Sequence, residues 1–208
     1  MLFGILMIIL SGCKRNFENE NLDNNSNNVV EHTFNFITDT SDWKCANIEY
    51  DLICYPNTWT KINQDKIYFL TYIDENDRNT FLSICKYSLD TCEFDADKYL
   101  RIFYKGVIAD SIEKVSSYSV TKLEFREQFS YYCELDLTKD NKRYKSMTMI
   151  FSVRNLLYDI SLKGYLSDYE TNKKIFQTIL YKFKSSNASI FSPEDPLKSI
   201  KEIDMARF

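Results

Sequence analysis

The feature that most restricts the fold of this chain is a long β region in which short polar turns separate four strand-like segments. In the first of them, Val120, Leu123 and Phe125 alternate with polar side chains, the pattern of a half-buried strand. The turn at 139–142, KDNK, is rich in residues that favour tight turns. Sequential strands joined by such turns are predicted to pair antiparallel. The four segments are residues 118–126, 129–137, 144–153 and 156–162.

Further strand candidates precede this region. Residues 43–55, WKCANIEYDLICY, hold the first ones, and Pro56 ends the run because proline cannot donate a hydrogen bond to a ladder. Residues 67–73, IYFLTYI, and 80–88, TFLSICKYS, follow, with the polar loop 74–79 between them. These two segments are predicted to form a hairpin.

Two segments have helical periodicity instead. Residues 95–115 space their apolar side chains as a helix does, with Asp95 as the N-cap. Residues 167–184 form a second amphipathic helix, which Ser167 and Glu170 are predicted to open as a capping box. The order of elements predicts an α+β fold, with an antiparallel sheet of about six to seven strands and two helices packed on it.

The corner Tyr55-Pro56-Asn57-Thr58-Trp59 resembles the one that begins domains of the PsbP/Mog1-like fold. In those domains a hairpin, a helix, a β-meander and a C-terminal amphipathic helix follow, and residues 48–184 are similar in order. The resemblance implies a non-catalytic scaffold that binds a partner. It assigns a structural role to Tyr55, Pro56 and Trp59 and no other residue roles.

The N-terminus has the pattern of an export signal. Residues 1–10, MLFGILMIIL, are apolar but too short for a stable bilayer span. Residues 10–13, LSGC, resemble a bacterial lipobox, which implies removal of a signal peptide at 1–12 and acylation, as by palmitate, of Cys13. The alternative is a buried N-terminal strand or helix with an incidental cysteine.

The remaining boundaries follow from composition. Residues 13–33 carry the lipid and an Asn-rich tether that has too few apolar side chains to fold. The α+β domain is expected at 34–185 and a C-terminal tail at 186–208. This organisation predicts a protein held on the lipid bilayer of the bacterial cell envelope, at the outer membrane, facing the periplasm or the surface.

Five cysteines besides Cys13 raise the question of disulfides. Cys85 and Cys92 flank a predicted turn and are the easiest pair by geometry. Cys45 and Cys54 would lie about 30 Å apart on one continuous strand and can pair only if the chain bends between them. Buried free thiols are the alternative reading. The five are Cys45, Cys54, Cys85, Cys92 and Cys133.

The sequence lacks the residues that most kinds of catalytic and cofactor-binding sites require. The single histidine, His32, lies in the predicted tether, so no histidine-rich metal site or Cys–His pair is expected. The chain has 4 glycines and no phosphate-binding loop, and with a net charge of −4 and no basic stripe it is not expected to bind nucleic acid. We therefore expect no catalytic residue, metal or cofactor.

Carboxylate pairs provide the one enzymatic alternative. Glu134 and Asp136 share a face of a predicted strand, as the acid and base of a glycosidase do, although the same pattern is typical of a solvent face. The other pairs are Glu124 with Glu127 and Asp136 with Asp140.

Three functions remain open at this point. The first is a tethered, non-enzymatic module that binds a protein partner or ligand in the envelope. The second is a carboxylate-based hydrolase of envelope glycans, and the third is an immunity-type or structural lipoprotein. The surplus of tyrosines could line a groove for a peptide or sugar, although core packing is their usual role. The tyrosines in question are Tyr68, Tyr72, Tyr87, Tyr131 and Tyr132.

Overall fold

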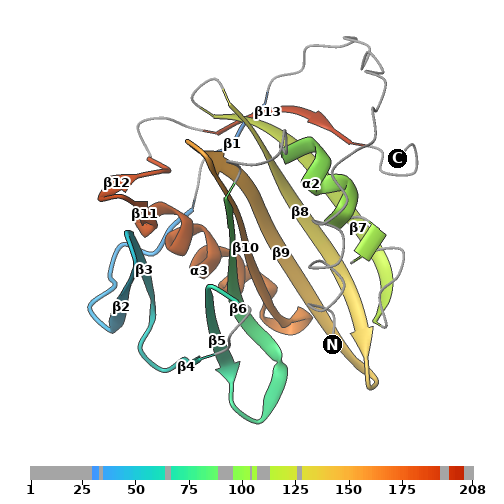
Figure 1. Ribbon diagram of the computed structural model, residues 1–208. Coiled ribbons are helices and arrows are strands. Elements are labelled where there is room, and N and C mark those ends of the chain that lie inside the picture. Colours follow the sequence, from blue (N-terminus) through green and yellow to red (C-terminus); the bar gives the residue numbers. More distant parts are fainter. Residues whose placement is uncertain are drawn as a thin grey trace.

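The computed structural model shows two antiparallel sheets and two helices (Figure 1). It describes residues 30–32, 35–63, 67–88, 96–103, 105–106, 113–125, 128–192 and 197–203. The predicted signal peptide, Cys13 and most of the predicted tether lie outside these residues.

The strands and helices follow one another in the predicted α+β order. The helices are α2 (Ala96–Phe103) and α3 (Tyr169–Lys182). The strands are β1 (Val30–His32), β2 (Trp43–Ile48), β3 (Asp51–Pro56), β4 (Thr60–Ile62), β5 (Phe69–Asp74), β6 (Asp77–Ser88), β7 (Lys114–Phe125), β8 (Gln128–Lys139), β9 (Lys142–Val153), β10 (Leu156–Tyr165), β11 (Lys184–Ser185), β12 (Ala188–Ser189) and β13 (Leu197–Glu202).

Every strand pair is antiparallel, which confirms the predicted fold class. The larger sheet has nine strands in the order β1-β13-β7-β8-β9-β10-β6-β5-β4, and the smaller has four in the order β12-β11-β3-β2. There are more strands than the predicted six to seven. The additional ones are mostly two to three residues long, too short to show a period of two.

The central hairpin of the meander forms where the polar turn predicts it. Asp140 and Asn141 connect β8 and β9 with φ angles of 52° and 61°. Two successive residues in the left-handed region make the turn type whose twist matches that of a hairpin. Asp and Asn tolerate this conformation better than most residues, so the local sequence agrees with the register.

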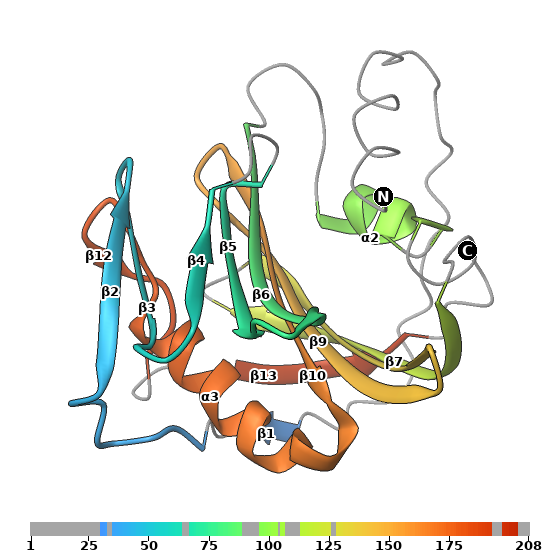
Figure 2. The same cartoon turned by 90° about the horizontal axis from the view of Figure 1, so that it is seen from below.

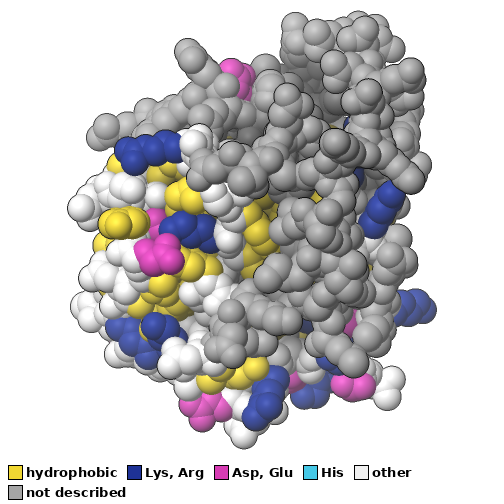
Figure 3. All heavy atoms as spheres, in the orientation of Figure 1, with side chains coloured by type: hydrophobic (Ala, Val, Ile, Leu, Met, Phe, Trp, Pro, Cys, Tyr) yellow, Lys and Arg dark blue, Asp and Glu magenta, His cyan; other side chains and the backbone are white. Residues whose placement is uncertain are grey.

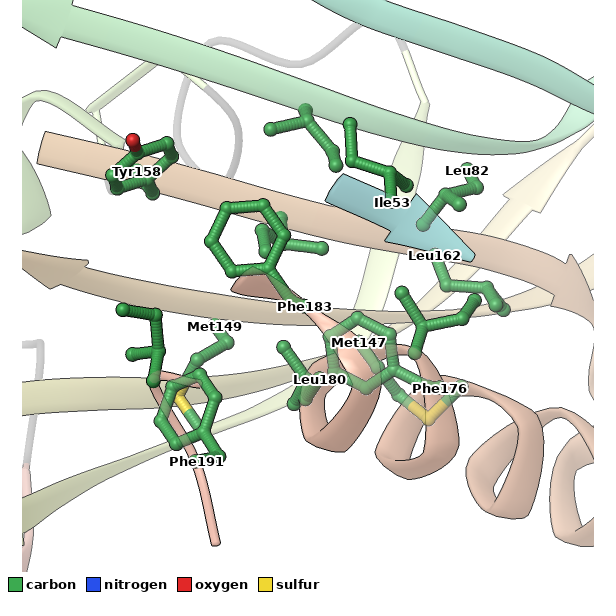
Figure 4. Close-up of a cluster of buried hydrophobic side chains, with 14 of the residues drawn as sticks. Ile53, Leu82, Met147, Met149, Tyr158, Leu162, Phe176, Leu180, Phe183 and Phe191 are labelled. Carbon is green, nitrogen blue, oxygen red and sulfur yellow. The ribbon is translucent and has the colours of Figure 1, made fainter. Parts of the chain in front are cut away.

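The helices cover opposite faces of the large sheet (Figure 2). Phe176 and Leu180 of α3 pack with Met147 and Leu162 on one face, and Ile53 of the small sheet joins the same core (Figure 4). On the other face, the buried Tyr99, Leu100 and Phe103 of α2 pack with Cys133 and Leu135 of β8. Because side chains alternate along each strand, adjacent residues of β8–β10 serve both cores.

Three details of the prediction are wrong. The capping box is absent, because a 3₁₀ turn, Leu166–Asp168, precedes α3, so the N-cap is Asp168. The Ser167 hydroxyl donates to Asp168 Oδ1 at 3.1 Å and not to the helix. The helix expected at 95–115 is shorter, since α2 ends at Phe103 and β7 begins at Lys114.

The third correction concerns the C-terminal boundary. Residues assigned to a tail form β12 and β13, and β13 pairs with β7 inside the large sheet. Ile190, Phe191 and Leu197 are buried. The prolines of this stretch suggested a tail, but its apolar side chains complete the core. Part of the predicted tether likewise forms β1, which pairs with β13.

Gly164 of β10 provides a test of how tightly α3 packs on the sheet. A Cβ atom at this position would lie 2.3 Å from the Asn172 amide nitrogen. Substituting Gly164→Ala should therefore lower the free energy of unfolding by about 1–2 kcal/mol, with the Asn172 side chain relieving part of the overlap. Urea denaturation measures the change, and a variant as stable as the wild type would contradict this packing.

Candidate interaction surface

The hairpin formed by β2 and β3 is held together by a disulfide. Cys45 and Cys54 are directly opposite in the register and are bonded, with their Cα atoms 4.0 Å apart. The chain bends between them at Glu49 and Tyr50, and Glu49 has a φ of 53°. The sequence requires a bend between Cys45 and Cys54 for the two cysteines to pair, and the structure has this bend.

The expected Cys85–Cys92 disulfide is wrong, because Cys85 is a free, buried thiol. Cys92 lies outside the described residues. Cys85 belongs to β6 and lies opposite Asp159 of β10 in the sheet. Burial and the Asp159 carboxylate raise the pKa of the Cys85 thiol to about 12, so it stays protonated and unreactive at neutral pH.

The tip of the hairpin exposes an aromatic side chain. Tyr50 is 78% exposed, and among the described residues the only other exposed large hydrophobic side chain is Tyr118, at 38%. Figure 3 shows hydrophobic side chains gathered with basic and acidic ones on the side of the molecule that carries β2, β3 and β5. A single exposed aromatic residue is ordinary, but this one stands on a cross-linked turn.

A buried ion pair fixes the base of the tip. Lys86 Nζ of β6 lies 3.2 Å from Asp51 Oδ2 and 2.9 Å from Glu49 Oε2. The Asp51 side chain is fully buried and also accepts a hydrogen bond from the Tyr158 hydroxyl at 3.0 Å. Burial would lower the pKa of Lys86, but its bonds to Glu49 and Asp51 raise it above its usual value. The lysine therefore stays charged and connects the hairpin to the large sheet.

A groove runs between the hairpin and the edge of the large sheet. Its volume is about 280 Å³. The Tyr68 hydroxyl donates to the Ile48 carbonyl oxygen, and Lys86 Nζ lies 4.6 Å from the centre of the Tyr68 ring. The groove exposes somewhat more polar than apolar surface, and its lining comprises Ile48, Lys61, Ile62, Asn63, Ile67, Tyr68 and Phe69.

The structural corner lies behind this surface. Tyr55 and Trp59 are buried in the core, and the Trp59 backbone N–H donates to the Pro56 carbonyl oxygen at 3.2 Å. The corner carries the chain from β3 in the small sheet to β4 in the large one. It therefore sets the position of the hairpin relative to the groove.

The carboxylates of Glu134 and Asp136 on β8 are both paired with a lysine. Glu134 and Asp136 share one cation, since Lys145 Nζ lies 3.3 Å from Glu134 and 2.9 Å from Asp136. Burial would raise both pKa values, but hydrogen bonds from Tyr132 and Tyr169 to Glu134, and from Ser117 and Lys145 to Asp136, lower them. Both carboxyls are therefore ionised at neutral pH.

The other two carboxylate pairs form no site in the described residues. Asp140 lies in the exposed β8–β9 turn and Glu124 is exposed on β7. Glu127 lies outside the described residues.

A second polar cluster surrounds Asp77, at the end of β6 opposite to Lys86. Burial would raise the pKa of Asp77, but hydrogen bonds from Lys142, the Asn79 backbone amide, Tyr165 and Tyr144 outweigh it and lower the pKa strongly. The hydroxyls of Tyr165 and Tyr144 donate to the carboxylate at 2.8 and 2.9 Å. The carboxylate thereby ties the β5–β6 turn to β9 and β10.

This cluster predicts a specific pH dependence. The folded-state pKa of Asp77 lies below the unfolded value of about 4, so its stabilisation is complete above about pH 4 and is lost as the pH falls. The variant Asp77→Asn should be less stable than the wild type at pH 6, and the difference should shrink towards pH 2. Urea denaturation across this range measures it, and a constant difference would contradict the assignment.

A second hollow near this cluster is a weaker candidate for a binding site. Its volume is about 490 Å³. Lys142 is paired with Asp77, and the Ser167 hydroxyl with Asp168, so two of its polar groups already have partners within the chain. The hollow is lined by Lys142, Arg143, Tyr165, Leu166 and Ser167.

In the part of the chain that the structure describes, no group of three or more His, Cys, Asp or Glu side chains could hold a metal ion. No described helix is both long enough and apolar enough to cross a bilayer.

Comparison with known proteins shows the fold and no more. No protein-family model matches the chain, and no curated protein matches its sequence. The solution structure of cyanobacterial PsbP (CyanoP) from Synechocystis sp. PCC 6803 is 15% identical, with a TM-score of 0.50. The match covers 79% of this chain and 98% of that chain.

Two further structures are more distant. LpqN from Mycobacterium tuberculosis, described as involved in cell envelope biogenesis, is 13% identical over 76% of this chain and 91% of that chain, with a TM-score of 0.42. A protein from Bacteroides thetaiotaomicron is 12% identical over 69% of this chain, with a TM-score of 0.40. This chain spans about half of that protein, 48%. The likeness to CyanoP shows that this chain has a PsbP-like α+β fold.

Proposed function

We propose that this protein is a non-catalytic, partner-binding domain anchored in the bacterial envelope through an acylated Cys13. The observation that carries the proposal is the hairpin clamped by Cys45–Cys54, with Tyr50 exposed at its tip. Disulfides persist in oxidising compartments outside the cytosol. The disulfide therefore supports export independently of the signal at residues 1–12.

The tip has the properties of an interface anchor. Tyrosine is among the residues that dominate binding energy in protein interfaces. The disulfide and the Lys86–Asp51 ion pair hold the turn in place, so little order would need to be gained on binding. The adjacent groove offers both polar and apolar surface to the same partner.

The predicted carboxylate pair and the free thiols support binding over catalysis. A glycosidase acid needs a raised pKa, whereas those of Glu134 and Asp136 are both lowered. The free thiols of Cys85 and Cys133 are buried and have raised pKa values, the reverse of a nucleophile. The hydrolase is therefore the weaker candidate.

The anchor is tested by substituting Cys13→Ser. Loss of the acylated cysteine should move the protein from the membrane fraction to the soluble fraction of lysed cells, since a single-residue change removes the lipid attachment. A matched Cys85→Ser variant, which alters a cysteine of the folded domain, should stay with the membrane if it folds. Retention of Cys13→Ser in the membrane would contradict the anchor.

The binding surface is tested by purifying partners from detergent-solubilised envelopes, followed by mass spectrometry. The Tyr50→Ala variant should lose at least tenfold in affinity for the partner that the wild type retains, as expected of an aromatic anchor. Lys174→Ala, on an exposed position of α3, should bind as the wild type does. Glycan cleavage by the purified protein, with no partner retained, would overturn the proposal in favour of the hydrolase.

A further inference from the structure

Within the described residues the two sheets have four free edges, and three of them are very short. In the large sheet the edge strands β1 and β4 have three residues each, and in the small sheet β12 has two. Short edges are a usual protection against unwanted pairing with other chains. The fourth edge, β2, has six residues and lies at the outside of the described structure (Figure 2).

The register of the hairpin shows which backbone groups of β2 face outwards. Ile48 and Asp51 close the two-residue turn, so in an antiparallel ladder Ile48, Ala46 and Lys44 direct their N–H and C=O groups towards β3. Cys45 and Asn47 then direct theirs to the free edge. The 4.0 Å between the Cα atoms of Cys45 and Cys54 agrees with this, because pairs without mutual hydrogen bonds lie closest.

The β2 edge lacks the usual protective features. Within β2 there is no proline, and its pairing with β3 runs from Trp43 to Ile48 without a bulge. The charge of Lys44 does not protect the edge, because its ammonium group binds within the chain. It donates to the carbonyl oxygens of Asn57 at 2.9 Å and Trp59 at 2.8 Å. Cys45 and Asn47 are exposed, and no described strand pairs with this edge of the sheet.

From these observations we infer that β2 binds an extended polypeptide segment of the partner by strand addition. Backbone N–H and C=O groups at alternate residues match the backbone of an extended chain, as in strand addition to an exposed sheet edge. Alternate side chains of the added strand fall on the face of Ala46 and Ile48, two apolar residues that pack against the core and lie beside the groove. The segment should therefore carry apolar residues at alternate positions.

The inference rests on the proposed function. Substitutions at one residue, Asn47, test strand addition separately from partner binding as such. Asn47→Pro removes an outward N–H, a change that edge strands tolerate, whereas Asn47→Ala removes the side chain and keeps the N–H. The probes are dodecapeptides selected from a random library on the full-length protein in detergent. Asn47→Pro should weaken their binding at least tenfold, and Asn47→Ala by less than threefold.

Amide hydrogen exchange gives a second readout in the wild type, so the test holds even if Asn47→Pro misfolds. Saturating peptide should slow exchange at Cys45 and Asn47. Unchanged exchange there, or equal binding by the proline variant, would overturn strand addition. A dimer that Asn47→Pro dissociates would also overturn it, because the occupant would then be a second copy. If Asn47→Pro keeps the envelope partner that Tyr50→Ala loses, strand addition fails while the proposed function stands.

Discussion

The variant Lys86→Met should lower the free energy of unfolding by about 3–5 kcal/mol, the largest effect that we expect from a single substitution at the contact between the hairpin and the large sheet. Methionine keeps the apolar length of the side chain but leaves Asp51 without its cation. The Asp51 side chain is fully buried, and breaking a buried pair on one side leaves an uncompensated charge in the protein interior. Chemical denaturation of the oxidised protein measures the loss.

Matched variants separate the buried charge from the other contacts of Lys86. Lys61→Met removes an exposed lysine at the same groove and should change stability by less than about 0.5 kcal/mol. Glu49→Gln should cost at most about 1 kcal/mol, because Glu49 is 60% exposed. The double variant Asp51→Asn/Lys86→Met should be more stable than Lys86→Met alone. Equal losses in Lys86→Met and Lys61→Met would contradict the buried pair.

Removal of the disulfide should have the second largest effect. The Cys45→Ala/Cys54→Ala variant should lose about 2–3 kcal/mol, since the cross-link closes a short loop in the unfolded chain. A reducing agent should destabilise the wild type by a similar amount and leave the variant unchanged. Hydrogen exchange at the hairpin tip should become faster in the variant. Equal stability of the wild type with and without reductant would show that the disulfide does not form in the folded protein.

The meander could be predicted from the sequence because its local signals agree with one another. Alternation over β7–β10 identifies the strands, and the residues at 139–142 have the left-handed preference that their turn requires. The fold class follows from the order of these elements. The placement of the two helices on opposite faces could not be predicted from the order of elements. It depends on which individual residues of β8–β10 point to each of the two cores.

The candidate surface could be predicted only in part, because its turn lacks the usual turn residues. Glu49 occupies the left-handed region although glycine or asparagine is favoured there. The sequence therefore predicts strands within residues 43–55 without locating the bend between them, and the Cys45–Cys54 pairing depends on that bend. The pairing across the turn fixes both the disulfide and the exposure of Tyr50. The short edge strands were missed because two or three residues show no periodicity.

The most direct test of the proposed interaction surface is site-specific photo-crosslinking in intact cells. A photoreactive amino acid replaces Tyr50 at the hairpin tip, or Lys174 on an exposed position of α3 as the control. A partner-binding hairpin predicts a discrete crosslinked protein from position 50 that is absent from position 174. The same adducts from both positions, or none from position 50, would contradict it.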